Sequence, residues 1–426
     1  MVHLLLKRIP SKSIILPPRY NVFSVCVQNF LLTFSPLYVY SIIESSLVSR
    51  QISLFMQIPS PLTARQLFCV WKGAAMYPLL TVDLNKIEAN VKTVTGLCRE
   101  YRLQVAGVTK VVRGEPAIAS AMVAGGVTAL ADSHWENLRR LEGLGVERWM
   151  IRIPAIDEAE PLVQNAEGSL NSDADTLRAL DRAARRLGRT HKVILMADLG
   201  DLREGFMDDS TLITTAHLVQ DEMPGLVLAG VGVNLTCFSF VQSDTEKLIH
   251  LARLADALGL PRPIVSGGNS ATLDLMLNGG IPVGITQLRL GESLLFGRER
   301  AKYRYLPGTY NDAFLLHAEI VECRDKPSLP IGTIGSDSYG HRPSFTDRGI
   351  RRKAICAIGR QSIDCETMWP TDPGVQILGA SSDHLMLDVT DSEQSYHSGD
   401  IVQFRLGYFS TMRAYTSPYV EIQYHG

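Results

Sequence analysis

One lysine follows directly after a short apolar segment. Lys110 comes after Val105-Ala-Gly-Val-Thr109 and before Val111 and Val112. Apolar surroundings lower the pKa of a lysine, which leaves a neutral amine that can form a Schiff base with a carbonyl group. A lysine can also lay its stem on apolar residues and keep its ammonium in water. Lys110 alone leaves both interpretations open.

Polar residues follow several other apolar segments. They are Asp198-Leu-Gly-Asp-Leu-Arg-Glu-Gly205, Asn234, Ser266-Gly-Gly-Asn-Ser270 and Arg289-Leu-Gly-Glu292. A glycine-rich turn with a serine, together with backbone N–H groups after an arginine, can bind a phosphate group. One lysine, one arginine and this turn in one site indicate a phosphorylated cofactor.

Eight apolar segments rich in Val, Ile, Leu and Ala would bring these residues together. They begin near Val105, Ala129, Trp149, Gly168, Val193, Val227, Ile264 and Gln287. Helical patterns separate them, including Pro116–Ala124, Trp135–Leu144, Asp173–Leu187 and Thr245–Leu258. Such alternation predicts a parallel sheet, and eight units in fewer than about 200 residues favour a closed (β/α)8 TIM-type barrel over an open sheet. The polar residues would then meet at the barrel mouth.

After about residue 306 the pattern changes to short β segments separated by Gly, Pro and Asp. These segments are His317–Glu322, Ala354–Gly359, Gln376–Gly379, His384–Val389 and Ile401–Leu406. They predict an all-β domain. The chain is therefore expected to be an α/β protein with a barrel over residues 76–305 and a C-terminal β domain over residues 306–426.

Residues 1–75 differ in composition from the rest of the chain. They contain one acidic residue, Glu44, and the stretch Tyr20–Ile43 carries no charge. A membrane anchor and an acid-poor transit peptide are two interpretations. We favour a third, in which translation begins at Met76 and the upstream stretch is not part of the fold.

Composition narrows the class of ligand. The chain has 426 residues, 46% of them hydrophobic and 20% charged, with a formal net charge of −2. This balance gives no electrostatic reason to expect nucleic acid and favours a small-molecule ligand. The seven cysteines form no CxxC pair, which argues against a zinc or disulfide framework and fits a reducing cytoplasm.

Taken in order, the motifs resemble the alanine racemase superfamily of enzymes that depend on pyridoxal 5'-phosphate (PLP), and most closely its ornithine racemase branch. The resemblance covers residues 77–426. It rests on Val-Thr-Lys110-Val-Val, Ala131-Asp-Ser133, Asp198 to Gly205, Asn234-Leu-Thr-Cys-Phe238, Ser266 to Ser270, Leu288-Arg-Leu-Gly-Glu292, Gly379-Ala-Ser-Ser-Asp-His384 and Thr416-Ser-Pro-Tyr419. It implies a fold type III PLP enzyme, a PLP-binding barrel followed by a β domain, that racemises an amino acid, with ornithine expected.

The resemblance also assigns roles to single residues. Lys110 would hold PLP as a Schiff base and act as the base on one face of the substrate Cα. Arg289 would donate to the pyridine nitrogen and leave it unprotonated, because a guanidinium is not readily deprotonated. Arg203 would lie near the substrate carboxylate. The cofactor's phosphate side is expected at Asn269, Ser270, Gly291 and Tyr419.

Racemisation needs a second acid/base on the opposite face of Cα. In the family it is a tyrosine of the other subunit, and Ser338-Tyr-Gly340 resembles that motif. Tyr339 is therefore the candidate, which implies a head-to-tail homodimer, with Asp337 as the alternative. A turn tyrosine that only packs on the partner is the other interpretation. The family's phosphate-binding tyrosine after the lysine is absent here, and Arg113 either substitutes for it or is solvated.

A basic substrate would need a carboxylate for its distal ammonium, because an unpaired buried charge is costly. Asp337, Asp383, Glu204 and Glu292 are the candidates, although each could instead orient an arginine. Alternatives to an ornithine racemase are an alanine, lysine or broad-specificity racemase, a PLP-homeostasis barrel protein without a β domain, and a lyase. A metal-assisted aldolase is disfavoured because Ser382-Asp-His384 lacks the order His-x-Asp, and no metal is expected.

Overall fold

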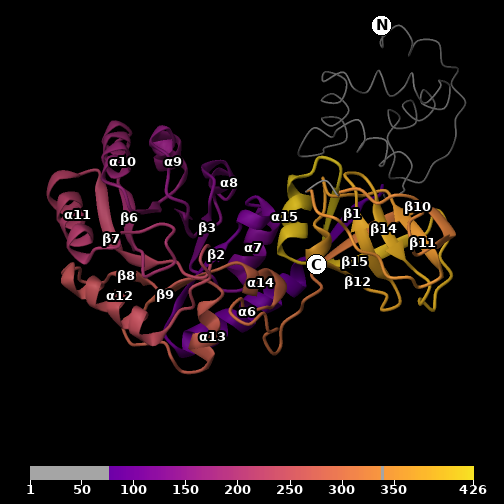
Figure 1. Cartoon of the computed structure of the whole chain (residues 1–426). Helices are drawn as coiled ribbons and strands as arrows, with labels where there is room; N and C mark the ends of the chain where they lie inside the picture. The colour runs from indigo at the N-terminus through magenta and orange to yellow at the C-terminus, as the bar shows by residue number, and fades with distance from the viewer. Residues whose placement is uncertain (1–75, 337–339) are drawn as a thin grey trace, which may run out of the picture. The chain divides into compact units, whose positions relative to one another are not determined.

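The computed structural model describes residues 76–336 and 340–426. Within it, residues 77–426 form one compact unit that contains a closed parallel barrel and an antiparallel sheet (Figure 1). The barrel strands are β2 (Gln104–Val108), β3 (Ala129–Asp132), β4 (Glu147–Met150), β5 (Gly168–Asn171), β6 (His191–Ala197), β7 (Leu226–Val233), β8 (Ile264–Ser266) and β9 (Gln287–Leu290). The predicted eight-stranded barrel is confirmed.

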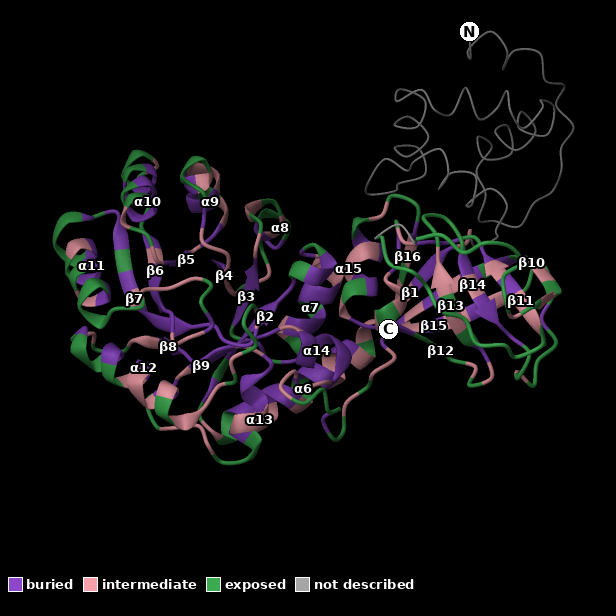
Figure 2. Ribbon diagram, viewed as in Figure 1, coloured by how far each residue is buried: buried purple, intermediate pink, exposed green. Residues whose placement is uncertain are grey.

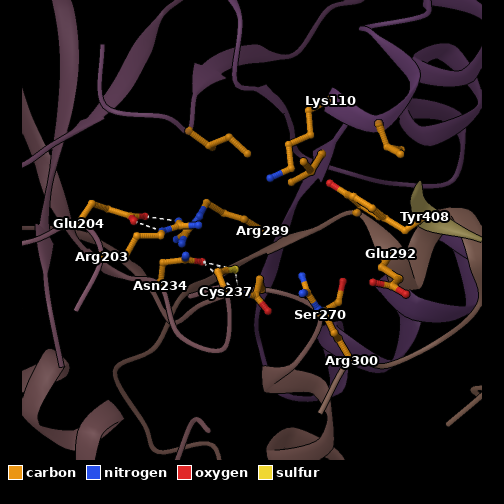
Figure 3. A pocket seen from close by; sticks show the side chains of 15 residues that line it. Lys110, Arg203, Glu204, Asn234, Cys237, Ser270, Arg289, Glu292, Arg300 and Tyr408 are labelled. Carbon is orange, nitrogen blue, oxygen red and sulfur yellow. Dashed lines mark hydrogen bonds and ion pairs between the residues drawn. The ribbon is translucent and has the colours of Figure 1, made fainter. Parts of the chain in front are cut away.

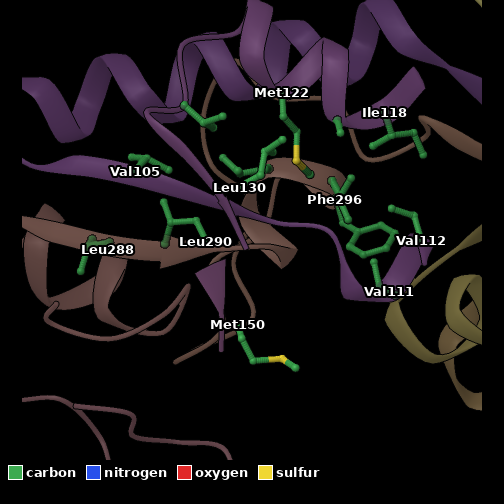
Figure 4. Close-up of a cluster of buried hydrophobic side chains, with 14 of the residues drawn as sticks. Val105, Val111, Val112, Ile118, Met122, Leu130, Met150, Leu288, Leu290 and Phe296 are labelled. Atoms are coloured by element: carbon green, nitrogen blue, oxygen red, sulfur yellow. The ribbon is translucent and has the colours of Figure 1, made fainter. Parts of the chain in front are cut away.

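Barrel strands bury both faces, and alternate residues point to opposite sides. In β2, Val105 belongs to the large core between strands and helices, whereas Ala106 and Val108 belong to a smaller cluster inside the barrel. In β9, Leu288 belongs to the large core (Figure 4), so the same alternation turns Arg289 inward. The pleat of the last strand therefore places a guanidinium inside the barrel.

Helices surround the barrel strands and bury one face on them (Figure 2). They are α6 (Leu84–Glu100), α7 (Pro116–Ala124), α8 (Trp135–Arg140), α9 (Ala159–Asn165), α10 (Ala174–Arg186), α11 (Asp209–Glu222), α12 (Thr245–Ala257), α13 (Thr272–Leu277) and α14 (Glu292–Phe296). Asp173, Asp208 and Asp244 cap α10, α11 and α12 by accepting from backbone N–H groups. Helix α8 is shorter than predicted, because the chain turns before Gly143 and Gly145, both with positive φ.

The second sheet confirms the predicted C-terminal β domain. Its strands are β10 (Phe314–Pro327), β11 (Ile350–Cys356), β12 (Met368–Pro370), β13 (Gln376–Ala380), β14 (Leu385–Asp388), β15 (Ile401–Leu406) and β16 (Glu421–His425), with helix α15 (Tyr408–Thr416) before the last. Strand β11 lies earlier than the predicted Ala354–Gly359. Its first half carries Arg351 and Arg352, which the hydrophobic pattern does not mark as a strand, and Arg351 pairs with Asp388 at 2.8 Å.

The first strand of the unit, β1 (Leu79–Asp83), belongs to the antiparallel sheet. It pairs with β10 and β16, and the chain then enters the barrel through α6. The domain limits 76–305 and 306–426 thus remain a prediction, with β1 lying on the side of the β domain. Among residues 76–336 and 340–426, no helix has the length and apolar character needed to cross a membrane. The interpretations of residues 1–75 lie outside the described residues.

Barrel closure should be sensitive to Gly230 in β7, where the chain passes close to β8. A Cβ at Gly230 would lie 1.9 Å from the Ile264 carbonyl oxygen, so backbone would have to move. We expect Gly230→Ala to lower the free energy of unfolding by about 2–3 kcal/mol, as overpacking does. Urea unfolding followed by circular dichroism measures this change.

Gly96 in α6 provides the control, because nothing lies within 4 Å of a Cβ placed there. Gly96→Ala should raise the free energy of unfolding by up to about 1 kcal/mol, the helix-propensity difference. Equal effects of the two substitutions would contradict the close approach of β7 and β8.

Candidate active site

A pocket opens at the carboxyl ends of the barrel strands, where the functional residues of such barrels lie (Figure 3). Its volume, including the part open to solvent, is about 680 Å³, which is in the range of small-molecule sites. Six predicted site residues line it: Lys110, Arg203, Asn269, Ser270, Arg289 and Gly291. Residues from the ends of four strands, β2, β6, β8 and β9, therefore meet in one place.

Four other predicted site residues do not line this pocket or cannot be placed. Tyr419 follows α15 and is 55% exposed. Asp383 lies between β13 and β14, where its carboxylate accepts from the Gln361 amide at 3.1 Å. Tyr339 and Asp337 lie outside the described residues. The roles of these four residues stay predictions.

Lys110 begins the short 3₁₀ turn Lys110–Val112 that follows β2. The preceding Thr109 is fully buried, and its hydroxyl donates to the Asp132 carboxylate at 2.7 Å, which fixes the end of the strand. Lys110 is exposed to the open pocket, into which its side chain extends (Figure 3). Desolvation of the amine by the pocket walls lowers the pKa of Lys110, and the nearby guanidinium groups of Arg203 and Arg300 lower it further. The neutral, nucleophilic amine is thereby favoured.

Arg289 lies inside the barrel beneath the pocket. Its Nη1 donates to Ser266 Oγ at 2.5 Å and its Nη2 to the Val233 carbonyl oxygen at 2.8 Å. Burial lowers the pKa of Arg289 to about 10, so the guanidinium is still protonated at neutral pH. A buried charge of this kind is costly unless it is hydrogen-bonded. The two hydrogen bonds fix the direction in which the guanidinium faces the pocket.

The turns after β8 and β9 form another wall of the pocket. Ser270 Oγ and Ser293 Oγ lie 3.1 Å apart, and Ser293 N donates to Ser270 Oγ at 3.3 Å. A Cβ at Gly291 would lie 3.2 Å from Val108 Cβ, so glycine lets the two strand ends approach closely. The Asn269 amide donates to the Leu235 carbonyl oxygen at 2.8 Å, which joins this wall to the loop after β7.

Arg300 and Tyr408 also line the pocket, and no motif or candidate set of the sequence analysis contained them. Arg300 follows α14, beyond any strand end. Tyr408 is the first residue of α15 in the β domain, and α15 packs against the turn that begins with Lys110. Burial raises the pKa of the Tyr408 hydroxyl to about 12, so it can donate at neutral pH. No local pattern marks these residues; Tyr408 reaches the pocket only through packing between the barrel and the β domain.

Arg113 does not lie where a residue that binds the cofactor's phosphate would lie. It does not line the pocket. Its Nη1 instead donates to the Tyr415 carbonyl oxygen of α15 at 3.2 Å. Arg113 thus helps to hold α15, and with it Tyr408, against the barrel.

The two carboxylates that line the pocket both have arginine partners. Glu204 forms an ion pair with Arg203, and Glu292, which is buried, accepts from Arg298 Nε at 3.1 Å. Three guanidinium groups line the pocket against these two carboxylates, those of Arg203, Arg289 and Arg300. The excess of positive charge suits an anionic ligand that carries a phosphate or a carboxylate.

The chain is similar to known racemases along most of its length. It is 43% identical over 350 residues to ornithine racemase from Acetoanaerobium sticklandii, which covers 81% of this chain and 99% of that protein. It is 36% identical over 355 residues to lysine racemase from Thermotoga maritima, which covers 82% and 99%.

Solved structures share the fold. Alanine racemase from Bartonella henselae with covalently bound pyridoxal phosphate superposes with a TM-score of 0.61 at 18% identity, over 82% of this chain and 99% of that chain. D-threonine aldolase from Filomicrobium marinum gives 0.58 at 18% identity, over 80% and 89%. The family model for the alanine racemase N-terminal domain matches residues 82–299. Together with the identity to the two racemases, this match shows that the chain belongs to the alanine racemase family.

Proposed function

We propose that this protein is a PLP-dependent amino acid racemase that interconverts the L and D forms of ornithine. One observation carries the proposal: the pocket combines the amine of Lys110, whose pKa is lowered, with the buried guanidinium of Arg289. PLP carries an aldehyde, with which the amine could form a Schiff base, and a ring nitrogen that could accept a hydrogen bond from the guanidinium. The relatives named ornithine racemase and lysine racemase support the reaction class.

The residues of the pocket fit PLP. The neutral amine of Lys110 would attach the aldehyde carbon covalently. The phosphate would be held by Ser270, the backbone at Gly291 and the cationic Arg300, with the Tyr408 hydroxyl as a further donor. The pyridine nitrogen would accept from Arg289. When bound, PLP supplies an electron sink for the charge that develops at Cα.

The chain's own residues would control the protons. Lys110 would remove the Cα proton on one face and return it in the reverse direction. The pKa of Arg289, about 10, keeps it protonated at neutral pH, so it would donate to the ring nitrogen without giving up its proton. Limited charge delocalisation into the ring favours return of a proton to Cα over side reactions. Arg203, held by Glu204, would bind the substrate carboxylate.

We further propose that a second copy completes the site in a head-to-tail homodimer. Four large apolar side chains are exposed in the loops after β6 and β7: Leu202, Met207, Phe238 and Phe240, each 60–69% exposed. Such apolar exposure near a pocket mouth is typical of interfaces. Tyr339 of the second copy would act as the acid/base on the opposite face of Cα, with Asp337 as the alternative.

The distal ammonium of ornithine would bind a carboxylate of the β domain of the second copy. Glu204 and Glu292 are already engaged by Arg203 and Arg298. Asp337 and Asp383 therefore remain the candidates, and alanine, lysine or broad specificity are the competing outcomes. A cytoplasmic location is also proposed, since among the described residues five cysteines are present as free thiols.

Replacing Lys110 tests the proposal directly. Lys110→Ala should remove the absorbance of covalently bound PLP and lower kcat/KM for ornithine racemisation by at least about a thousandfold, because one acid/base and the covalent link are both lost. Spectra, borohydride trapping and loss of optical rotation provide the measurements. Lys92→Ala, which removes a lysine exposed on α6, should behave as the unchanged protein. A Lys110→Ala protein that racemises ornithine at the normal rate would contradict the proposal.

The lowered pKa of Lys110 makes a prediction about pH. Because only the neutral amine attacks an aldehyde, the rate of PLP capture by the PLP-free protein should rise as pH rises through the pKa of Lys110. The midpoint should lie below 10.5, the ordinary value for lysine. Stopped-flow absorbance across a pH series measures it. A midpoint at or above 10.5 would contradict the role of desolvation.

The proposed dimer can be tested at Phe238, which is 62% exposed. Phe238→Asp should weaken the dimer at least about tenfold by burying a charge at the interface, and racemase activity should fall with dimer concentration. Sedimentation velocity over a dilution series measures the dissociation constant. Val283→Asp, at a fully exposed valine before β9, provides the matched control. An unchanged assembly in Phe238→Asp would exclude this face.

A further inference from the structure

Asn234 presents an unpaired donor in the wall of the pocket. It follows β7, is 8% exposed, and its Nδ2 has no hydrogen-bond partner. In the described part of the chain, three other buried side-chain atoms lack a partner, in Asn171, His191 and Thr411, but these residues do not line the pocket. Buried polar groups are nearly always hydrogen-bonded, so a donor left open in a binding pocket points to an acceptor on the ligand.

The orientation of the Asn234 amide follows from its neighbour. Asn269 Oδ1 accepts from Ala271 N at 2.9 Å, so the Nδ2 of Asn269 must face the other way. It donates to Asn234 Oδ1 at 3.0 Å, and the Cys237 thiol donates to the same oxygen at 3.7 Å. Exchanging the oxygen and nitrogen of Asn234 would place two donors against each other. The Nδ2 of Asn234 is therefore the atom that stays open.

The loop after Asn234 is held by a single buried carboxylate. Asp201 is fully buried and accepts from four backbone N–H groups, those of Thr236, Cys237, Phe238 and Val241, at 3.0–3.2 Å. Asp201 lies in the loop after β6 that also carries Arg203. The carboxylate therefore ties the two loops together and keeps Asn234 and Arg203 on the same wall of the pocket (Figure 3).

We propose that Asn234 Nδ2 donates a hydrogen bond to an anionic oxygen of the bound ligand. The proposal rests on the proposed function and adds a ligand-binding residue to it. Val233, directly before Asn234, accepts from Arg289, and Arg203 lies on the same wall, so the open donor is placed among cations that attract a negative charge. Two oxygens have this chemistry: the phenolic oxygen of PLP and the α-carboxylate of the amino acid.

Asn234→Asp is the sharpest test, because it keeps the oxygen that Asn269 and Cys237 contact and replaces the open donor by a negatively charged acceptor that repels an anionic ligand oxygen. PLP affinity is measured by fluorescence quenching of the PLP-free protein, and KM and kcat for ornithine on the loaded enzyme. We expect at least about a tenfold loss in one of the two, as for a hydrogen bond to a charged group. Weaker PLP binding identifies the cofactor oxygen, and a raised KM with unchanged PLP affinity identifies the carboxylate.

Asn234→Ala should show the same loss, and its thermal unfolding shows whether it folds. Asn171→Ala is the matched control, since Asn171 is also a buried asparagine that ends a barrel strand with an unpaired atom but does not line the pocket. It should change thermal unfolding without changing PLP affinity. A folded Asn234→Asp protein with normal PLP affinity and KM would overturn the inference. Failure of the unsubstituted protein to bind PLP would instead reject the proposed function, on which the inference rests.

Discussion

Closure of the barrel between β2 and β9 is the contact on which the pocket depends. These strands are the first and the last of the barrel, and they pair in parallel with Ala106 opposite Arg289 and Gly107 opposite Leu290. The register places Lys110, just beyond β2, near the turn that follows β9. Because alternate residues of a strand face opposite sides, the same register turns Arg289 into the barrel. The amine and the guanidinium thus share one pocket although nearly the whole barrel sequence separates them.

The barrel interior beneath the pocket is partly polar. Arg289 is buried with Ser266 and Gln287, and Ser266 donates to Gln287 at 3.0 Å. An apolar interior would stabilise a barrel at lower cost, since burying a guanidinium requires that its hydrogen bonds be supplied by the protein. The arrangement has a function in our proposal. A guanidinium that keeps its proton would leave the nitrogen of the cofactor ring unprotonated.

The β domain contributes to the pocket of its own chain. Strand β1 starts the compact unit within the antiparallel sheet, and α15 returns from that sheet to pack against the turn at Lys110. Arg113 and the Tyr415 carbonyl oxygen join the two parts. Tyr408 therefore reaches the barrel mouth from the β domain. The exposed apolar residues Leu202, Met207, Phe238 and Phe240 lie on the loops around the same mouth, where the proposed second copy would cover them.

The sequence alone determined the barrel, the β domain and six residues of the pocket, because strand periodicity and the polar residues at strand ends are local features of the chain. It did not determine the places of Tyr408 and Arg300, the partners of Glu204 and Glu292, or the loop held by Asp201. Nor did it predict that β1 joins the C-terminal sheet or that β11 begins at Ile350. These features depend on contacts between segments distant in sequence, and hydrophobic periodicity records which face of a segment is buried but not the segment against which it packs.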